Sequence, residues 1–391
     1  MSDWRAAMTD IAPGADRPLA RPNVFEIDLA AVASCTRAIR DLIGPRVHFT
    51  ATLKANAYGY GVLPVARTVL RASADALALA NLEDAVALRE AGIREPILVY
   101  AGVLPDTACA AALRDHDLTA TLHSEESRRA HAALAGPPLK VAVKVDIGPE
   151  RIGVPASTAA GFIQRVAGDP RFRLEAVNAH PNLPADADPE ALAWQYRRFL
   201  HVRDAVARLG VNVPRWVLAS SRVLRLTGTA MALNAVDPGD ALFSPLHSAD
   251  DTAPSPFHRL SSRLIQVRTV ERDAYLADAN FAMRPGMRVG IFPLGYSDGM
   301  RALHAGCVLV NGRRVPLAGP PALEYTRVDL TQAPGAMVGD EVVVVGAQGG
   351  ERISPAEAVR HQGAARVADL AMQVGPGVVR RYLPDAAQAP D

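Results

Sequence analysis

The residues best suited to chemistry stand in one short stretch, residues 53–61, with the sequence Leu-Lys-Ala-Asn-Ala-Tyr-Gly-Tyr-Gly. An apolar run precedes this stretch and apolar residues at helical spacing follow it, which predicts Lys54 at the junction of a strand and a loop. A lysine there is most often a surface residue whose ammonium group extends into water. A lysine partly desolvated by the strand end would instead have a lowered pKa and could attack a carbonyl to form a Schiff base.

The residues after Lys54 favour the second interpretation. They supply an amide, a hydroxyl and exposed backbone N–H groups, which suit a phosphate-bearing ligand beside the lysine: Asn56, Tyr58, Gly59 and Gly61. The order Lys-Ala-Asn-Ala-Tyr-Gly-x-Gly after a strand resembles the motif by which alanine racemases hold pyridoxal 5'-phosphate (PLP). The resemblance implies that Lys54 attaches PLP and that Tyr58 contacts it.

Composition and charge narrow the functional classes. The chain has 391 residues, enough for two or three domains. Its 42 basic residues nearly balance 41 acidic ones, so there is no excess of positive charge that would indicate binding to nucleic acid or to a membrane surface. Three widely spaced cysteines predict no disulfide framework, and the sequence neighbours His304 and Cys307 are too few ligands for a metal site. No apolar stretch has the length of a signal peptide or membrane span, so a cytoplasmic protein is expected.

The elements that must position Lys54 alternate along the chain. After a predicted mobile tail at residues 1–22, eight short apolar runs alternate with amphipathic helical stretches, and the early runs recur at about 22–26 residues. This spacing predicts an α/β fold with a TIM-type (β/α)8 barrel at residues 23–250, with chemistry at the C-terminal ends of its strands. Val-rich pieces between Gly and Pro turns predict a C-terminal, mostly β domain at residues 251–391. The eight runs are residues 48–53, 74–80, 96–102, 118–123, 140–146, 174–180, 215–220 and 232–236.

Three of the predicted strand ends carry further residues that match the family. Residues 144–153 are consistent with an ordinary strand and turn, but they also resemble the pattern Lys-x-Asp-Thr-Gly-Met-x-Arg-x-Gly. The resemblance implies that Arg151 approaches the PLP phenolic oxygen and the substrate carboxylate, which a guanidinium fork suits. Lys144 falls where many members carry a carbamylated lysine. His180 matches a histidine at the cofactor ring, and Ser221 matches a phosphate-binding serine, although a structural histidine and a helix cap are alternatives.

The largest departure from the family lies at Asp237. Residues 234–243 align with Asn-x-Val-Arg-x-Gly-x-x-x-Tyr, and Asp237 takes the place of the arginine that faces the PLP pyridine nitrogen. Arginine only donates hydrogen bonds, whereas a carboxylate would favour the protonated ring and a longer-lived carbanion. In this alignment Gly239 and Asp240 supply amides to the phosphate. Alternatively, the alignment is slipped and Asp237 caps a turn.

The second domain carries weaker matches. Residues 293–299 resemble Pro-x-Gly-Tyr-x-Asp-Gly, which implies a substrate-binding role for Tyr296, and Leu323 falls where a backbone N–H contacts the substrate carboxylate. Alanine racemases donate a tyrosine across a dimer interface as the second acid/base. Tyr275 is the nearest candidate, although the aligned position falls nearer Ala277 and an ordinary strand tyrosine is an alternative.

The resemblance implies a PLP-dependent amino-acid racemase that acts on a small-molecule amino acid, not necessarily alanine, as a homodimer with shared active sites. In this hypothesis Lys54 is one base at the substrate Cα and Tyr275 is the opposite acid/base. An alternative on the same scaffold is a PLP-dependent lyase or aldolase, hydroxymethyltransferase or decarboxylase, which Asp237 favours. A non-catalytic PLP carrier is a third possibility, against which the second domain counts.

Overall fold

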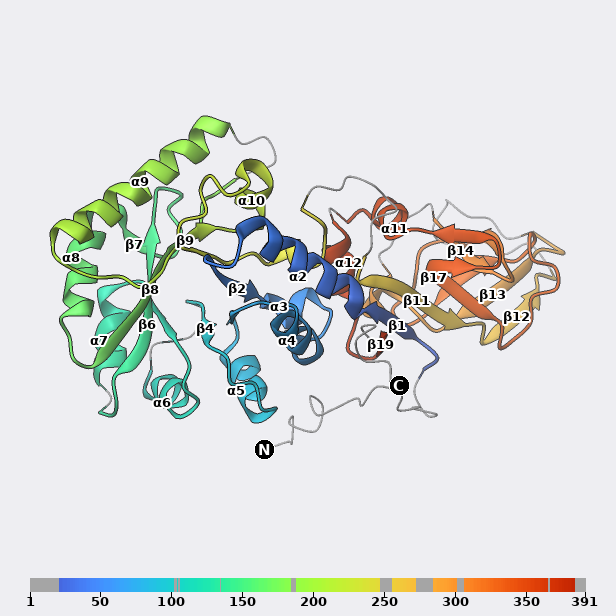
Figure 1. Cartoon of the computed structure of the whole chain (residues 1–391). Helices are drawn as coiled ribbons and strands as arrows, with labels where there is room; N and C mark the ends of the chain where they lie inside the picture. The colour runs from blue at the N-terminus through green and yellow to red at the C-terminus, as the bar shows by residue number, and fades with distance from the viewer. Residues whose placement is uncertain are drawn as a thin grey trace, which may run out of the picture. The chain divides into compact units, whose positions relative to one another are not determined.

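The computed structural model describes residues 21–101, 104, 106–133, 135–183, 188–246, 255–271, 284–300, 306–364 and 366–383. The described residues form two compact units (Figure 1). One, the barrel unit, is Val32–Ser248; the other, the β unit, combines the described parts of Met1–Ala31 and Ala249–Asp391. Apart from Arg21 and Pro22, the predicted tail lies outside the described residues.

The barrel unit is built on parallel strands, as the eight apolar runs predict. Their order is β4-β3-β2-β10-β9-β8-β6-β5, and a parallel bridge between Leu98 and Thr119 joins the two ends of this order. The predicted TIM-type barrel is therefore confirmed. All four residues of β3 are buried, so short Ala-rich strands suffice where both faces are covered. The strands are β2 (His48–Thr52), β3 (Ala76–Leu79), β4 (Ile97–Val99), β5 (Ala120–Leu122), β6 (Leu139–Asp146), β8 (Phe172–Ala179), β9 (Trp216–Ala219) and β10 (Ala235–Val236), with β7 (Val154–Pro155) beside β6.

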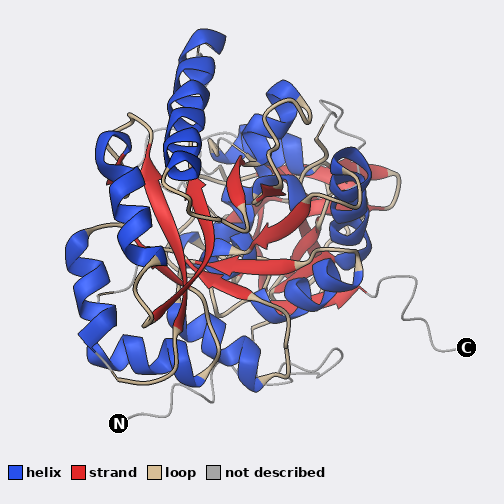
Figure 2. Ribbon diagram, turned by 60° about the vertical axis from the view of Figure 1, so that its left-hand side comes forward, coloured by secondary structure: helices blue, strands red, loops and turns tan. Residues whose placement is uncertain are grey.

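Helices connect these strands and lie outside them (Figure 2). Side chains fix where several helices begin: Asn81 and Asp188 accept from the N–H groups of Glu83 and Glu190, and Asp106 accepts from that of Cys109. Within the described chain, none of the helices combines the length and the apolar character that crossing a membrane requires. The helices are α2 (Leu29–Ile43), α4 (Val62–Arg71), α5 (Leu82–Glu90), α6 (Thr107–Asp115), α7 (Glu125–Ala133), α8 (Ala156–Ala167), α9 (Pro189–Arg208) and α10 (Ser221–Thr227).

The β unit is mostly β, as predicted. One sheet has the order β15-β14-β17-β11-β1-β19, with β18 paired to β17, and a second sheet has the order β12-β13-β16. The strands are β1 (Val24–Asp28), β11 (Phe257–Arg263), β12 (Gln266–Thr269), β13 (Arg288–Phe292), β14 (Cys307–Val310), β15 (Arg313–Pro316), β16 (Thr326–Asp329), β17 (Glu341–Gln348), β18 (Glu351–Ile353) and β19 (Val379–Leu383). The helices are α11 (Pro355–Gln362) and α12 (Val367–Gln373).

Strand β1 lies in the β unit, whereas the sequence interpretation placed it at the start of the barrel domain, residues 23–250. It pairs antiparallel with β11 and parallel with β19. Phe25 of β1 is fully buried, and its ring centroid lies 4.5 Å from that of Phe257. The alternating pattern of residues 24–28 predicts a strand but not its partners, because pairing depends on residues at least 230 positions away in the chain.

Candidate active site

Lys54 directly follows Leu53 at the end of β2 and opens a strained turn, α3 (Lys54–Tyr58). Residues 55–58 all have left-handed backbone conformations, with φ between 51° and 55°. Such a conformation costs about 1–2 kcal/mol for each L-residue, and strain of this kind gathers at functional sites. The Asn56 side chain accepts from the Val62 N–H at 2.7 Å and so ties the turn to the start of α4. The residues after Lys54 thus form an unusual backbone turn that is hydrogen-bonded to the next helix.

The Lys54 side chain is exposed and lies near Tyr100, which follows β4. Its Nζ is 5.9 Å from the centroid of the Tyr100 ring, a cation–π distance. Tyr100 is a site residue that the sequence analysis did not identify. Its only sequence signal is its position at the end of a predicted strand.

Asp237 follows β10 and joins Tyr100 and Thr52 in a buried cluster. The Tyr100 hydroxyl donates to Asp237 Oδ2 at 2.9 Å and lies 3.1 Å from Thr52 Oγ1, which donates to the Asp237 backbone carbonyl at 3.0 Å. Asp237 is 7% exposed, and its Oδ1 is buried without a hydrogen-bond partner among the described residues. Burial raises the pKa of Asp237 to about 6, against the opposing charges of Lys144 and Lys54. An unpartnered buried carboxylate oxygen is costly, so this site can accept a donor from a ligand.

Cationic and imidazole side chains lie near enough to this cluster to influence one another's pKa values. Burial lowers the pKa of Lys144, on β6, to about 8, with further contributions from Arg151 and Lys54. Burial also lowers the pKa of His180, which follows β8, to about 3, and Lys144 and Arg151 act in the same direction. His180 is therefore neutral near pH 7.

The loop that carries Arg151 is folded onto its own strand. Asp146, the last residue of β6, accepts from the N–H groups of Gly148 at 2.9 Å and Arg151 at 3.1 Å. Gly153 allows the loop to fold back against β6, because a Cβ at this position would lie 2.5 Å from the Asp146 backbone nitrogen. The Arg151 side chain is exposed, so an anionic group can reach it.

A second group of polar contacts lies at the start of α10. Buried Ser221 accepts from the N–H groups of Gly239 at 2.9 Å and Ala241 at 3.0 Å, so its own O–H remains to donate to an anion. A Cβ on Gly239 would lie 2.4 Å from the Tyr58 hydroxyl, which places Tyr58 over this loop. The Asp240 carboxylate is paired with Arg225 at 2.6 Å, so its side chain is directed to that arginine.

The barrel unit therefore brings together most of the predicted site residues: Lys54, Tyr58, Arg151, His180, Ser221, Asp237 and Gly239. Tyr296 and Leu323 lie in the β unit as neighbours, since the N–H groups of Tyr296 and Ser297 donate to the carbonyls of Ala322 and Leu323. Both side chains are more than half exposed, at 56% and 53%. Tyr275 lies outside the described residues.

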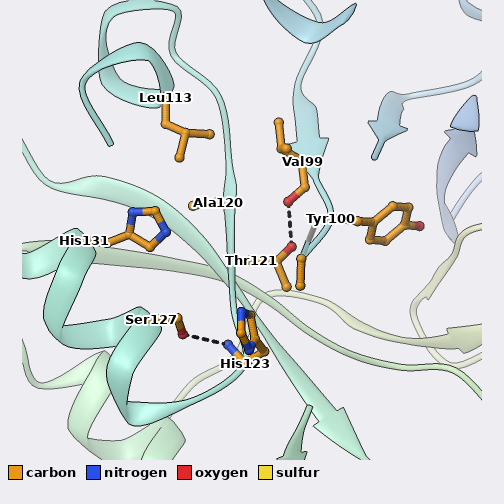
Figure 3. Close-up of a pocket in the computed structure, with 9 residues that line it drawn as sticks. Val99, Tyr100, Leu113, Ala120, Thr121, His123, Ser127 and His131 are labelled. Atoms are coloured by element: carbon orange, nitrogen blue, oxygen red, sulfur yellow. Dashed lines mark hydrogen bonds between the residues drawn. The ribbon is translucent and has the colours of Figure 1, made fainter. Parts of the chain in front are cut away.

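A small cavity lies beside the Tyr100 backbone, away from the ring and its hydroxyl group (Figure 3). It is lined by β4, β5, α6 and α7, and the Tyr100 ring points away from it (Figure 3). His131 is 5% exposed at this cavity, and burial, with Arg114 nearby, lowers its pKa. Thr121 Oγ1 donates to the Val99 carbonyl at 2.7 Å across its floor. The hydrogen bond joins β5 to β4, and the Tyr100 hydroxyl takes no part in this cavity (Figure 3).

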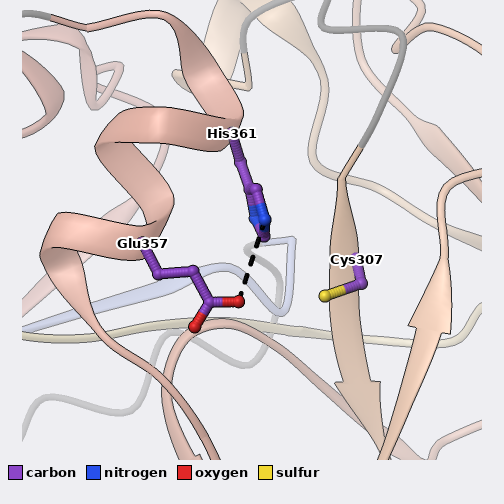
Figure 4. A group of neighbouring side chains, drawn as sticks. All are labelled: Cys307, Glu357 and His361. Atoms are coloured by element: carbon purple, nitrogen blue, oxygen red, sulfur yellow. Dashed lines mark ion pairs between the residues drawn. The ribbon is translucent and has the colours of Figure 1, made fainter.

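Three potential metal ligands meet in the β unit, where the sequence predicts no metal site. The donor atoms of Cys307, Glu357 and His361 lie within 4.8 Å of one another (Figure 4). The Arg314 guanidinium already donates to both carboxylate oxygens of Glu357 and lies 3.5 Å from Cys307 Sγ. Because this guanidinium supplies the positive charge that a metal would bring, we interpret the cluster as an ion-pair network.

Comparison with known proteins connects this geometry to a family. Residues 27–246 match the description "Alanine racemase, N-terminal domain", and residues 257–382 match "Alanine racemase, C-terminal domain". The alanine racemase of Geobacillus stearothermophilus is 32% identical over 351 residues, which cover 87% of this chain and 88% of the relative. That of Desulfovibrio desulfuricans is 32% identical over 372 residues, covering 93% and 98%.

Solved structures agree with the sequence matches. The alanine racemase of Bacillus anthracis with bound L-Ala-P superposes with a TM-score of 0.81 at 27% identity, covering 96% of this chain and 97% of that one. The biosynthetic alanine racemase of Pseudomonas aeruginosa gives a TM-score of 0.76 at 29% identity, covering 93% and 100%. The resemblance drawn from the motifs is thereby confirmed.

Proposed function

Because the chain belongs to the alanine racemase family of PLP-dependent racemases, we propose that it binds PLP at Lys54 and interconverts the enantiomers of a small amino acid. The observation that carries the proposal is the convergence of Lys54, Tyr100 and Asp237 at the C-terminal ends of β2, β4 and β10. Alanine is the first substrate to test, since the relatives are named alanine racemases.

The residues of the barrel unit fit PLP. The Lys54 amine suits an aldehyde, and the Ser221 hydroxyl beside the Gly239 loop suits a phosphate. Asp237 Oδ1, buried and unpartnered among the described residues, suits a ring N–H donor. When bound, PLP supplies an electron sink that acidifies the hydrogen on the substrate Cα.

The chain's own residues then perform the proton transfers. Lys54 takes or returns the proton on one face of the substrate Cα. Arg151 orients the substrate carboxylate, and the hydrogen bonds from its loop to Asp146 hold its backbone in place. Inversion also needs a proton donor on the opposite face, and we assign that role to Tyr275. Tyr296 and Leu323 are assigned to substrate binding. We propose a homodimer with shared active sites, in which Tyr275, Tyr296 and Leu323 take part.

Deuterium exchange at Cα tests the proposal. Full-length protein loaded with PLP is incubated in heavy water with single enantiomers of alanine, serine and larger amino acids, followed by chiral chromatography and mass analysis. We expect deuterium in both enantiomers of at least one amino acid, and no exchange with Lys54→Ala. Tyr275→Phe should keep exchange in one enantiomer and lower inversion by about 10²–10⁴-fold.

Two outcomes would contradict the racemase proposal. Exchange with fully retained configuration would show a one-base enzyme. Loss of a side chain or carboxyl group would support the lyase or decarboxylase alternative, which the carboxyl group of Asp237 favours.

A further inference from the structure

We propose that Asp237, Tyr100 and Thr52 form a closed hydrogen-bonded ring that holds a proton on the Asp237 carboxyl group, as a neutral acid at the mouth of the barrel. The three residues follow or end β10, β4 and β2, and β2 is hydrogen-bonded directly to β10. The ring itself is independent of the reaction, whereas its use as a proton source rests on the proposed function.

The inference rests on the number of hydrogen atoms available for the contacts among Asp237, Tyr100 and Thr52. The ring contains three oxygen–oxygen contacts, of 2.9 Å from Tyr100 to Asp237 Oδ2, 3.1 Å from Tyr100 to Thr52, and 3.0 Å from Thr52 to the Asp237 carbonyl. The two hydroxyl groups supply one hydrogen each. With an ionised carboxylate, one of the three contacts therefore brings two oxygen atoms together without a hydrogen between them.

A protonated carboxyl group supplies the third hydrogen. Asp237 Oδ2–H then donates to the Tyr100 hydroxyl, Tyr100 donates to Thr52, and Thr52 donates to the Asp237 carbonyl. All three contacts become hydrogen bonds in one direction around the ring. Thr52 completes the ring by accepting the Tyr100 hydrogen, which only the neutral acid releases for it.

Burial and charge act on the same group in opposite directions. Asp237 is 7% exposed, and an ionised Oδ1 would be a buried charge without a donor among the described residues. Lys144 and Lys54 favour ionisation, and Tyr100 is the other titratable group in contact. Burial nevertheless prevails and raises the pKa of Asp237 to about 6. The neutral acid that the hydrogen count requires is therefore the main form of Asp237 below about pH 6, and the carboxylate is the main form above it.

In its neutral form, the ring gives the site a stored proton for a basic ring nitrogen. Rotation of the Asp237 carboxyl group by half a turn about its Cβ–Cγ bond brings the O–H group to the position that the unpartnered Oδ1 occupied. There the Asp237 O–H bond breaks, an N–H bond forms on the ligand, and the Tyr100 O–H donates to the carboxylate that remains. The transfer needs no other donor. Tyr100 and Thr52 are positioning residues in this scheme, because they act through Asp237.

Replacing Thr52 by valine distinguishes two explanations for the protonation of Asp237, the hydrogen-bonded ring and burial alone. The Thr52→Val variant removes the acceptor for the Tyr100 hydrogen in the neutral form but leaves the Tyr100 bond to the ionised carboxylate intact. We expect the pKa of Asp237 to fall by about 0.5–1, the worth of one neutral hydrogen bond. If burial alone governed Asp237, the more apolar valine would raise its pKa instead. Thr52→Ser is the matched control, which keeps the hydroxyl and should keep the titration.

The measurement is carbon NMR of full-length protein freed of cofactor and labelled at its aspartate carboxyl carbons, with the Asp237 signal assigned by its loss in Asp237→Asn. An unchanged or raised midpoint in Thr52→Val would overturn the ring. A second sample, loaded with PLP, reports the pH dependence of the cofactor absorbance, which Asp237→Asn and Thr52→Val should both shift. If the wild type takes up no PLP at Lys54, the proposed function fails while the NMR titration still decides the ring. If it takes up PLP and neither variant shifts the absorbance, the proton transfer is refuted.

Discussion

At the scale of single residues, Asp237 links the chemistry of the site to the stability of the fold. Asp237 directly follows the barrel strand β10, and burial raises the pKa of its carboxyl group to about 6 from an ordinary value of 3.8. Between those two values the folded protein holds a proton that the unfolded chain has lost. The contribution of Asp237 to stability is therefore largest below this window and falls as the pH rises through it.

Asp237→Asn should abolish this pH dependence. Asparagine keeps an acceptor for Tyr100 and carries no charge, so the variant should become more stable than the wild type as the pH rises from 4 to 7. We expect a gain on the order of 2 kcal/mol in the free energy of unfolding at pH 7 and almost none at pH 4. Urea unfolding of the cofactor-free protein across this range measures it. Asp115→Asn, on the exposed end of α6, is the control, and a gain that is constant with pH would refute the assignment.

The predicted site residues show which interactions sequence motifs can encode. Lys54, Arg151 and Ser221 stand in continuous motifs, so their types and spacing are enough to identify them. Thr52 and Tyr100 form no motif with Asp237, because 48 and 137 positions of chain separate Tyr100 from its two partners. Their contact arises only when the barrel brings the strand ends together.

At the scale of elements, the turn after β2 is the most unusual piece of backbone. Residues 55–58 follow one another in the left-handed region, and Gly59 continues it with φ of 85°. The sequence predicts a loop here but not its handedness. Gly59 and Asn56 are residue types that tolerate this conformation, whereas Ala55 and Ala57 adopt it only because their surroundings hold them.

Glycine substitution should therefore have opposite effects in two elements. Ala55→Gly relieves a left-handed alanine, worth about 1–2 kcal/mol, against about 0.5–1 kcal/mol of added chain entropy in the unfolded state. We expect a net stabilisation of up to about 1 kcal/mol. Ala87→Gly, inside the right-handed helix α5, should destabilise by about 1 kcal/mol. Chemical unfolding of both variants measures this, and equal destabilisation would show that Ala55 is not strained.

At the scale of the whole molecule, the β unit is assembled from both ends of the chain. Strand β1 lies between β11 and β19, so residues 24–28 and 379–383 are adjacent in one sheet. Phe25 is fully buried there, against the Phe257 ring on one neighbour and with the Arg380 guanidinium 6.0 Å from its centroid on the other.

Phe25→Ala should consequently damage the C-terminal sheet, although the residue is near the N-terminus. Removing a buried phenylalanine costs about 3–5 kcal/mol, and the loss should appear as faster amide hydrogen exchange in β11 and β19. Phe162→Ala, a buried phenylalanine of α8 in the barrel unit, is the matched control and should speed exchange in α8 and β8. Faster exchange confined to the barrel unit in Phe25→Ala would contradict the pairing of β1.

The sequence by itself determined the family, the order of the eight barrel strands along the chain, the mostly β character of the second domain, and the lysine on which the site is built. These depend on local patterns, because apolar periodicity and continuous motifs are properties of neighbouring residues. Only the tertiary structure decided the sheet to which β1 belongs, the left-handed turn after Lys54, and the ring of Thr52, Tyr100 and Asp237. Each of these depends on groups that lie far apart in sequence, or on a backbone conformation that runs against the local preference of its residues.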